Sequence, residues 1–153
     1  MSNFYFDTSA LVKYYITEIG SGWVQSCLEN PSTFVFTSLL TSIESVCTFT
    51  RRCREGQLTT EDLAQMQALL TYDFAYRYEV LAVDLDIIET AQQLANRHPL
   101  RAYDAVQLAT AWLANKDLVE ADKPPLTFVC ADVRLLAIAR DEGLQVEDPA
   151  AHA

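Results

Sequence analysis

The feature that most limits how this chain can fold is an alternation of short apolar runs with longer stretches of helical periodicity. The runs are rich in β-branched and aromatic residues, as expected of strands that are buried on both faces. They fall at Asn3–Asp7, Thr33–Thr37, Glu79–Val83, Leu126–Cys130 and, more briefly, Leu144–Glu147. Because helical patterns separate the runs, the strands should lie parallel with helices on both sides. The sequence therefore predicts an α/β fold, a three-layer α/β/α sandwich with a central, mainly parallel sheet.

The intervening helices are indicated by apolar spacing and by the proline and glycine residues that interrupt it. They are expected at Thr8–Thr17, Trp23–Leu28, Ser38–Arg54, Thr59–Tyr76, Asp84–Arg97, Arg101–Asn115 and Asp132–Glu142. No internal repeat or low-complexity segment separates one part of the chain from another. At 153 residues, the chain is predicted to form a single domain, 1–153, with its core at about 3–149.

The charge balance restricts the class of ligand. Lys and Arg number 11 against 21 Asp and Glu, which gives a formal net charge of −10. A nucleic-acid-binding surface is usually basic, so any binding of RNA should be confined to one local site. No apolar run approaches the roughly 20 residues of a membrane span, and the N-terminus lacks the basic segment of a signal peptide. We therefore expect a cytoplasmic protein with no membrane partner, in which the four cysteines are reduced thiols.

Two acidic residues stand where parallel sheets place their ligand sites. Asp7 and Asp132 each follow an apolar run and precede a helix. The carboxyl ends of parallel strands share one edge, where α/β proteins bind their ligands. Aspartate is also a favoured helix N-cap, so capping alone is the structural alternative for either residue.

Two further acids lie on helix faces that lean inward. On a helical wheel, Glu44 falls near the middle of an apolar stripe that includes Leu40 and Ile43, where an unpaired carboxylate is unfavourable. Asp104 borders the apolar face of its helix and lies in the first turn, where the helix dipole favours an anion. The structural alternatives are pairing with an arginine for Glu44 and capping for Asp104.

Carboxylates gathered in one cleft repel one another, so four of them together predict a bound cation. A hard divalent ion with oxygen ligands, Mg²⁺ or Mn²⁺, suits such a set. This ion would activate a water molecule and stabilise the charge of a phosphoryl transition state. Neither a Ser-His-Asp nor a Cys-His arrangement competes, because His98 and His152 lie in positions expected to be exposed.

The segments around these acids resemble a known family. They are Phe6–Lys13, Thr37–Glu44, Leu100–Ala111 and Phe128–Leu136. In order and separation they are similar to the four signature stretches of PIN domains, with VapC-type toxin ribonucleases of toxin–antitoxin pairs as the nearest subgroup. The resemblance extends from about residue 3 to residue 149.

This resemblance implies a PIN fold and metal-dependent endonucleolytic cleavage of RNA. The acidic Mg²⁺ or Mn²⁺ pocket of the family corresponds to Asp7, Glu44, Asp104 and Asp132. Thr8 or Ser9 would supply a hydroxyl or backbone N–H beside the metal or the phosphate. The family also implies a homodimer, together with a small antitoxin, encoded by a neighbouring gene, whose C-terminal segment enters the active-site groove.

Two positions depart from the family pattern. Cys130 stands where similar sequences commonly have Thr or Ser, and a thiol is a poorer hydrogen-bond donor. Gln107 stands where many relatives have His, at a position that we expect to be peripheral to the metals. Neither change removes an acid, so we expect an active enzyme.

Basic residues are candidates for holding the RNA. Lys13 and Arg101 flank the predicted acids and join Thr8 and Ser9 as candidate substrate contacts. A cluster of three arginines ends the helix that carries Glu44 and consists of Arg51, Arg52 and Arg54. Arginine suits phosphate binding, although cations at a helix C-terminus also complement its dipole.

Other functions fit the sequence less well. A catalytically silent PIN-fold module that binds an antitoxin or RNA would not need all four acids. A haloacid-dehalogenase-like phosphatase needs a second Asp two residues after the first, where this chain has Ser9. A receiver domain needs paired acids at its first strand and a late Lys, and no Lys follows Asp132.

Overall fold

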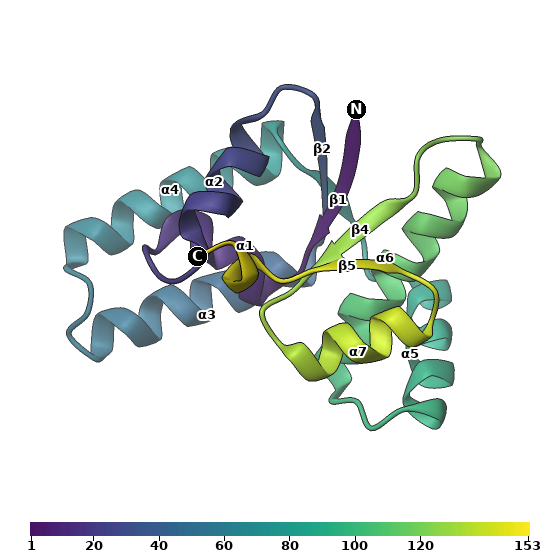
Figure 1. Ribbon diagram of the computed structural model, residues 1–153. Helices are drawn as coiled ribbons and strands as arrows, with labels where there is room; N and C mark the ends of the chain where they lie inside the picture. Colours follow the sequence, from purple (N-terminus) through teal and green to yellow (C-terminus); the bar gives the residue numbers. More distant parts are fainter.

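The computed structural model describes residues 1–153, and its core is a five-stranded sheet. The strands are β1 (Ser2–Phe6), β2 (Thr33–Ser38), β3 (Glu79–Leu81), β4 (Leu126–Val129) and β5 (Gln145–Glu147). Their order across the sheet is β3-β2-β1-β4-β5, and every neighbouring pair is parallel. The predicted parallel α/β sheet is confirmed, and Figure 1 shows β1 at its centre.

Helices cover both faces of the sheet, as predicted for a three-layer sandwich (Figure 1). They are α1 (Thr8–Tyr15), α2 (Ser21–Glu29), α3 (Leu40–Arg54), α4 (Thr60–Tyr76), α5 (Leu85–Arg97), α6 (Ala102–Glu120) and α7 (Val133–Asp141), followed by the short 3-10 helix η1 (Pro149–His152). Residues of α1 to α4 build one hydrophobic cluster, and residues of α5 to α7 build the other. No helix is both long and apolar enough to cross a membrane.

The alternation of side chains along the strands joins these two clusters to the sheet. Tyr5 packs with α5 to α7, whereas the next residue, Phe6, packs with α1 to α4. Phe128 and Val129 divide in the same way. All four side chains are fully buried, which explains why the strands are continuous apolar runs rather than alternating ones.

The chain order places a ligand site at the carboxyl end of β1. The strand that follows β1 in the sequence lies on one side of it, and β4 lies on the other, so the sheet order reverses there. Phe6 pairs with Val129, and the Asp7 N–H donates to the Val129 carbonyl at 3.1 Å. Ligands of open α/β sheets bind at such a switch point.

Several predicted boundaries need correction. α6 continues to Glu120 rather than ending near Asn115, whose side chain accepts from the Leu126 N–H at 3.0 Å. α3 begins at Leu40, since Ser38 still belongs to β2 and its hydroxyl accepts from the Leu40 N–H. β3 is shorter than predicted and ends at Leu81.

The face of α3 that packs against the sheet also differs from the prediction. The buried residues of α3 are Thr41, Ser45 and Phe49, whereas Ile43 is 56% exposed. The interpretation of Glu44 as a residue within a buried apolar stripe was therefore wrong. Near its start the helix buries the small hydroxyl side chains of Thr41 and Ser45 instead, and Glu44 is only partly buried.

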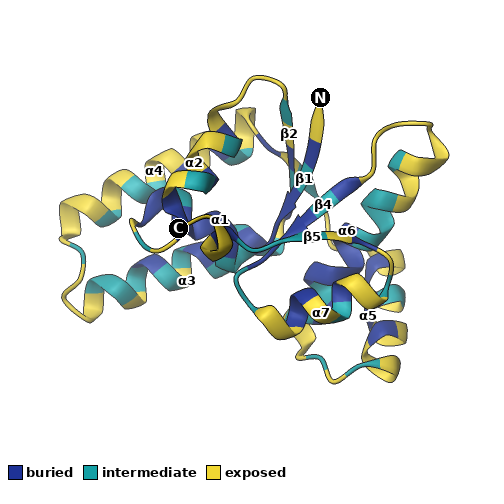
Figure 2. Ribbon diagram, in the orientation of Figure 1, coloured by how far each residue is buried: buried dark blue, intermediate teal, exposed yellow.

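The outer helix α4 is held by a buried carboxylate. Most of α4 is exposed (Figure 2), and its only buried residues are Leu70 and Asp73. Asp73 accepts from the Tyr15 hydroxyl at 2.6 Å and pairs with Arg77 at 3.0 Å. Tyr15 and Tyr78 are in turn 2.7 Å apart at their hydroxyl oxygens. This network ties α4 to α1 and β3.

Candidate functional site

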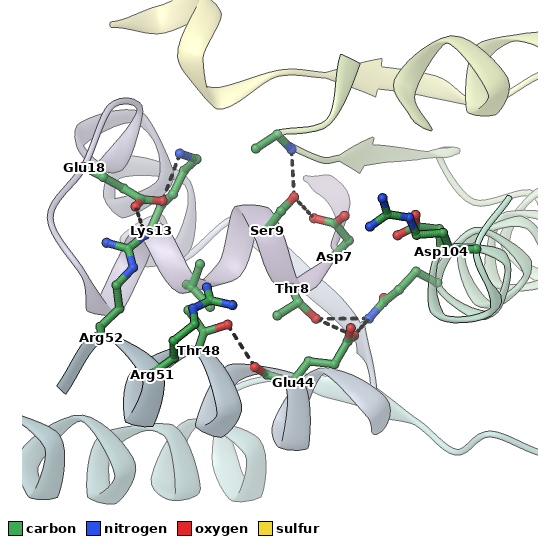
Figure 3. Close-up of a pocket in the computed structure, with 14 residues that line it drawn as sticks. Asp7, Thr8, Ser9, Lys13, Glu18, Glu44, Thr48, Arg51, Arg52 and Asp104 are labelled. Carbon is green, nitrogen blue, oxygen red and sulfur yellow. Dashed lines mark hydrogen bonds and ion pairs between the residues drawn. The ribbon is translucent and has the colours of Figure 1, made fainter. Parts of the chain in front are cut away.

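A polar cavity of about 530 Å³ opens beside the carboxyl end of β1. It lies between α1, α3 and the start of α6, and Figure 3 shows the side chains that line it. Asp7, Glu44 and Asp104 are among them. Asp132 lies in a smaller adjoining cavity of about 170 Å³, which it shares with Asp104 and Arg101. Four acids that are far apart in the sequence thus line two adjoining cavities, three of them in the larger one.

Asp7 is a buried carboxylate without a cation partner. It caps α1, and its Oδ1 accepts from the Ala10 N–H at 3.0 Å and the Ser9 hydroxyl at 2.7 Å. The side chain is 5% exposed. Burial raises the pKa of Asp7 to about 6, and the negative charge of Asp104 adds to the increase, although hydrogen bonds partly offset it. Asp7 is therefore both the N-cap of α1 and a carboxylate with a raised pKa.

Glu44 is held by two donors on one oxygen. Its Oε1 accepts from the Thr8 hydroxyl at 2.7 Å and from the Gln107 amide at 2.9 Å. The orientation of that amide follows from Tyr5, whose hydroxyl donates to the Gln107 Oε1 at 2.6 Å and so leaves Nε2 to face Glu44. Gln107 thus contacts a predicted metal ligand directly, and we interpret it as a residue that positions Glu44.

Asp104 and Asp132 are less enclosed. Asp104 accepts no hydrogen bond from the protein, and burial, followed by the charges of Asp132 and Glu44, raises its pKa. Asp132 caps α7 by accepting from the Arg134 N–H at 2.9 Å, and its side chain is 40% exposed. The positive charges of Arg101 and Arg134 act in the opposite direction and lower the pKa of Asp104. Neither arginine forms an ion pair with Asp104.

The donor set suits a hard cation in type and charge, although it is not drawn together around one point. No three His, Cys, Asp or Glu side chains are close enough to hold a single ion in this arrangement. Each of the four acids nevertheless keeps at least one carboxylate oxygen that accepts from no N–H or O–H group. Oxygen donors with mutual repulsion are the chemistry that Mg²⁺ and Mn²⁺ favour.

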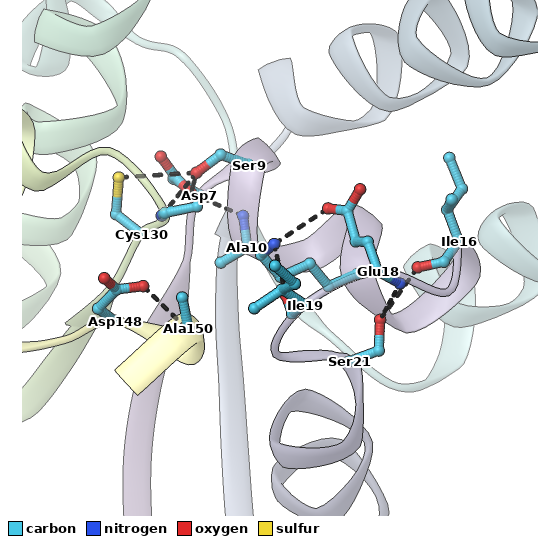
Figure 4. A network of polar contacts seen from close by, with 12 residues as sticks. Asp7, Ser9, Ala10, Ile16, Glu18, Ile19, Ser21, Cys130, Asp148 and Ala150 are labelled. Carbon is cyan, nitrogen blue, oxygen red and sulfur yellow. Dashed lines mark hydrogen bonds and ion pairs between the residues drawn. The ribbon is translucent and has the colours of Figure 1, made fainter. Parts of the chain in front are cut away.

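Ser9 and Cys130 connect Asp7 to the segment that carries Asp132 (Figure 4). The Ser9 hydroxyl accepts from the Ala131 N–H at 2.9 Å and lies 3.6 Å from the Cys130 sulfur. That sulfur accepts from the Asp132 N–H at 3.3 Å. Cys130 is fully buried, and burial raises the pKa of its thiol. The thiol thus braces the loop instead of facing the cavity.

Basic residues line the end of the cavity away from Asp7 and Asp104 (Figure 3). Lys13 and Arg52 are there, Arg51 lies on the side nearer to Glu44, and Arg54 does not line the cavity. Glu18 also lines this end and bridges Lys13 and Arg52, at 3.1 Å from each. Sequence reasoning missed Glu18 because no pattern links it to an arginine 34 residues away. Arg101 lies at the acidic end, beside Asp104.

Comparison with known proteins gives a family and a fold. The sequence profile of the PIN domain matches residues 4–124. No curated protein matches the chain.

Among solved structures, the chain is similar to a toxin–antitoxin complex from Klebsiella pneumoniae, with 19% identity, coverage of 95% of this chain and 97% of that one, and a TM-score of 0.60. It is similar to VapBC2 from Rickettsia felis, bound to a promoter DNA fragment, with 13% identity, 95% and 98% coverage and a TM-score of 0.65. Mycobacterium tuberculosis VapC20, a toxin that cleaves the sarcin-ricin loop, has 18% identity, 89% and 94% coverage and a TM-score of 0.62. At these identities the likeness shows the fold.

Proposed function

This chain belongs to the PIN-domain family, and from that membership and its acidic cavity we propose that it is a metal-dependent endoribonuclease of the VapC toxin type. PIN domains are generally nucleases. The observation that carries the proposal is that three of the four carboxylates line one cavity at the switch point of the sheet and the fourth lies in the adjoining cavity, with Asp7 buried and without a cation partner. A buried acid in this state is typical of a functional site.

Four residues would hold Mg²⁺ or Mn²⁺, and they are Asp7, Glu44, Asp104 and Asp132. When bound, the ion would supply Lewis acidity to a phosphoryl oxygen and lower the pKa of a water molecule. Thr8 and Ser9 donate their hydroxyl hydrogens to Glu44 and Asp7. We propose that these two residues orient the acids, and that Lys13 and Arg101 lie along the path of the RNA.

We further propose that the partner of this protein is a small antitoxin. Several structures of similar fold are toxin–antitoxin complexes. Exposed apolar side chains beside the acids offer it a surface, since Ile43 and Tyr103 line a cavity of about 290 Å³ together with Glu44. Co-expression with the product of a short neighbouring gene, followed by co-purification, tests this pairing.

A homodimer acting in the cytoplasm completes the proposal. Light scattering of the purified protein at several concentrations measures its mass in solution. A mass of twice 17.2 kDa supports the dimer, and a mass of 17.2 kDa at every concentration contradicts it.

The experiment that tests the activity is RNA cleavage with and without metal. We expect cleavage of single-stranded RNA in Mg²⁺ or Mn²⁺, and none in excess chelator. Asp104→Asn should abolish cleavage, whereas Asp141→Asn, at an exposed position outside the site, should leave it unchanged. Cleavage that persists in chelator contradicts the metal-dependent mechanism. A lack of cleavage under all conditions would favour a catalytically silent PIN module.

A further inference from the structure

The cavity has two ends of opposite charge. The acidic end contains Asp7, Glu44 and Asp104 with Arg101. The basic end contains Lys13 and Arg52 with Glu18, and Arg51 lies on the side of it nearer to Glu44 (Figure 3). On a chain of net charge −10, this local concentration of cations inside the same cavity as the acids needs an explanation.

The two ends are separated along two helices that pack side by side, α1 and α3 (Figure 3). Both helices start near the carboxyl edge of the sheet, where Asp7 caps α1 and Glu44 lies near the start of α3, and the cations lie farther along each helix. Arg51 follows Glu44 by seven residues, which corresponds to about 10 Å along the axis of α3. Lys13 follows Asp7 by six residues, or about 9 Å along α1. The cavity is therefore an oriented groove.

The wall of the basic end is fixed before any ligand arrives. Lys13 is 8% exposed, which is unusual for lysine, and it also donates to the Ile19 carbonyl at 2.8 Å. The Glu18 carboxylate holds Lys13 through one oxygen and Arg52 through the other. The Glu18 backbone is fixed as well, because its N–H donates to the Ser21 hydroxyl at 2.9 Å (Figure 4).

Arg51 is the cation in this end that remains available. Its side chain is 60% exposed, and its one ion pair, with Glu55, has an N···O distance of 4.0 Å. Arg54 lies on the same helix end and is also exposed, but it does not line the cavity. The three arginines that form one cluster in the sequence therefore differ in the structure. Arg52 is held by Glu18, Arg51 lines the cavity with an exposed side chain, and Arg54 lies outside the cavity.

We propose that the basic end is a phosphate subsite, in which Arg51, supported by Lys13 and Arg52, binds a backbone phosphate of the RNA on one side of the bond that is cleaved. This inference rests on the proposed ribonuclease function and adds a direction to it. The RNA strand runs from the acids along the groove between α1 and α3. The forked guanidinium of arginine suits a phosphate, and Glu18 prevents two neighbouring cations from repelling each other when the groove is empty.

The test compares Arg51→Ala with Arg54→Ala, which remove the same charge from the same exposed end of α3. Binding of a fluorescently labelled single-stranded oligouridylate is measured by anisotropy in chelator, so that no cleavage occurs. We expect Arg51→Ala to weaken binding about threefold. It should also reduce the slope of log K against log salt by about 0.7, the value for one phosphate contact on a single strand. Arg54→Ala should match the wild type.

Equal effects of the two substitutions, or no effect of Arg51→Ala, would overturn the subsite. Cleavage in Mn²⁺ provides a second measurement, in which Arg51→Ala should raise KM and leave kcat near the wild-type value. A change in kcat alone would also count against a phosphate contact outside the reacting bond. If the wild type cleaves no RNA in Mn²⁺, the ribonuclease proposal fails, and the binding comparison still decides whether the basic end binds phosphate.

Discussion

Asp7 and Asp73 are both buried aspartates, yet their surroundings differ. Asp73 is fully buried, forms an ion pair with Arg77 at 3.0 Å, and accepts from the hydroxyl of Tyr15. Asp7 is almost as deeply buried and has hydrogen bonds but no ion pair. Its pKa is raised by burial, with a further increase from Asp104.

We interpret Asp73 as a structural carboxylate and propose that Asp7 is a functional one. A buried charge is tolerated when an opposite charge and hydrogen bonds surround it, as at Asp73. Asp7 has hydrogen bonds but no opposite charge as a partner, and two further acids line the same cavity. Such a site is destabilising in the free protein and becomes favourable when a cation arrives. Substitutions at the two positions should therefore have opposite effects.

The largest expected effect is the loss of activity in Asp7→Asn. The amide still accepts a hydrogen bond and can cap α1, but it removes a negative charge from the proposed metal pocket. Because even substitutions behind metal ligands reduce activity or affinity 10- to 100-fold, we expect a loss of more than about 100-fold in kcat/KM. RNA cleavage in Mn²⁺ measures this. Activity within a few-fold of the wild type would remove Asp7 from the catalytic site.

Asp73→Asn should lower the stability of the protein and leave its activity nearly unchanged. The substitution weakens the hydrogen bond from the buried Tyr15 hydroxyl and removes the ion pair with Arg77, whose side chain is partly exposed, so the free energy of unfolding should fall by about 2 kcal/mol. The RNA cleavage rate per folded molecule should stay close to that of the wild type. Urea unfolding and cleavage assays on the same preparation check both statements. If Asp73→Asn had normal stability but had lost its activity, Asp73 could not be the structural carboxylate of the two.

The pH dependence of stability should also distinguish Asp7. Its pKa is 3.8 as an ordinary side chain and about 6 in the folded protein, so between these values the folded state holds a proton that the unfolded state has released. Raising the pH through this window therefore lowers the free energy of unfolding of the metal-free protein. The decrease is about 3 kcal/mol at most for a difference of this size.

Asp7→Asn lacks this titration and serves as the reference. It should be more stable than the wild type at pH 7 without metal, and the two should converge near pH 4. Urea unfolding at a series of pH values, in chelator, gives the difference directly. A difference that is constant across the series would mean that the environment of Asp7 does not penalise its charge.

The smallest of these effects concerns Gln107, which orients Glu44. Gln107→Leu removes the amide that donates to the Glu44 Oε1 and should weaken Mn²⁺ binding about tenfold, as changes behind metal ligands do. Tyr5→Phe removes only the hydrogen bond that orients the amide, so it should weaken binding less, in the same direction. Calorimetric titration with Mn²⁺ measures both. Unchanged affinity in Gln107→Leu would reduce this residue to a packing role.

The fold was predictable because its determinants are local. Strands buried on both faces appear as apolar runs, and Asp7 and Asp132 follow two of them, so the edge at which they meet could be inferred without a structure. The ends of helices were less predictable. The helix predicted to end near Asn115 continues to Glu120, and the Asn115 side chain makes a tertiary contact with Leu126.

The contacts inside the site depend on tertiary structure and left no sequence signal. Gln107 lies 63 residues from Glu44, and Glu18 lies 34 residues from Arg52. The helical wheel placed Glu44 on the wrong kind of face, because it assumed that apolar residues mark the buried side. In α3 the buried side carries Thr41 and Ser45, while Ile43 is exposed.

The most direct test of the central claim is calorimetric titration of the protein with Mn²⁺ at pH 6, repeated in two buffers of different ionisation enthalpy. Because Asp7 is partly protonated at this pH, binding of a cation to the acidic cavity should release protons. The account predicts Mn²⁺ binding with a buffer-dependent enthalpy in the wild type and in Asp73→Asn, and loss of that binding in Asp7→Asn. Equal Mn²⁺ binding by wild type and Asp7→Asn, or no binding by the wild type, would contradict it.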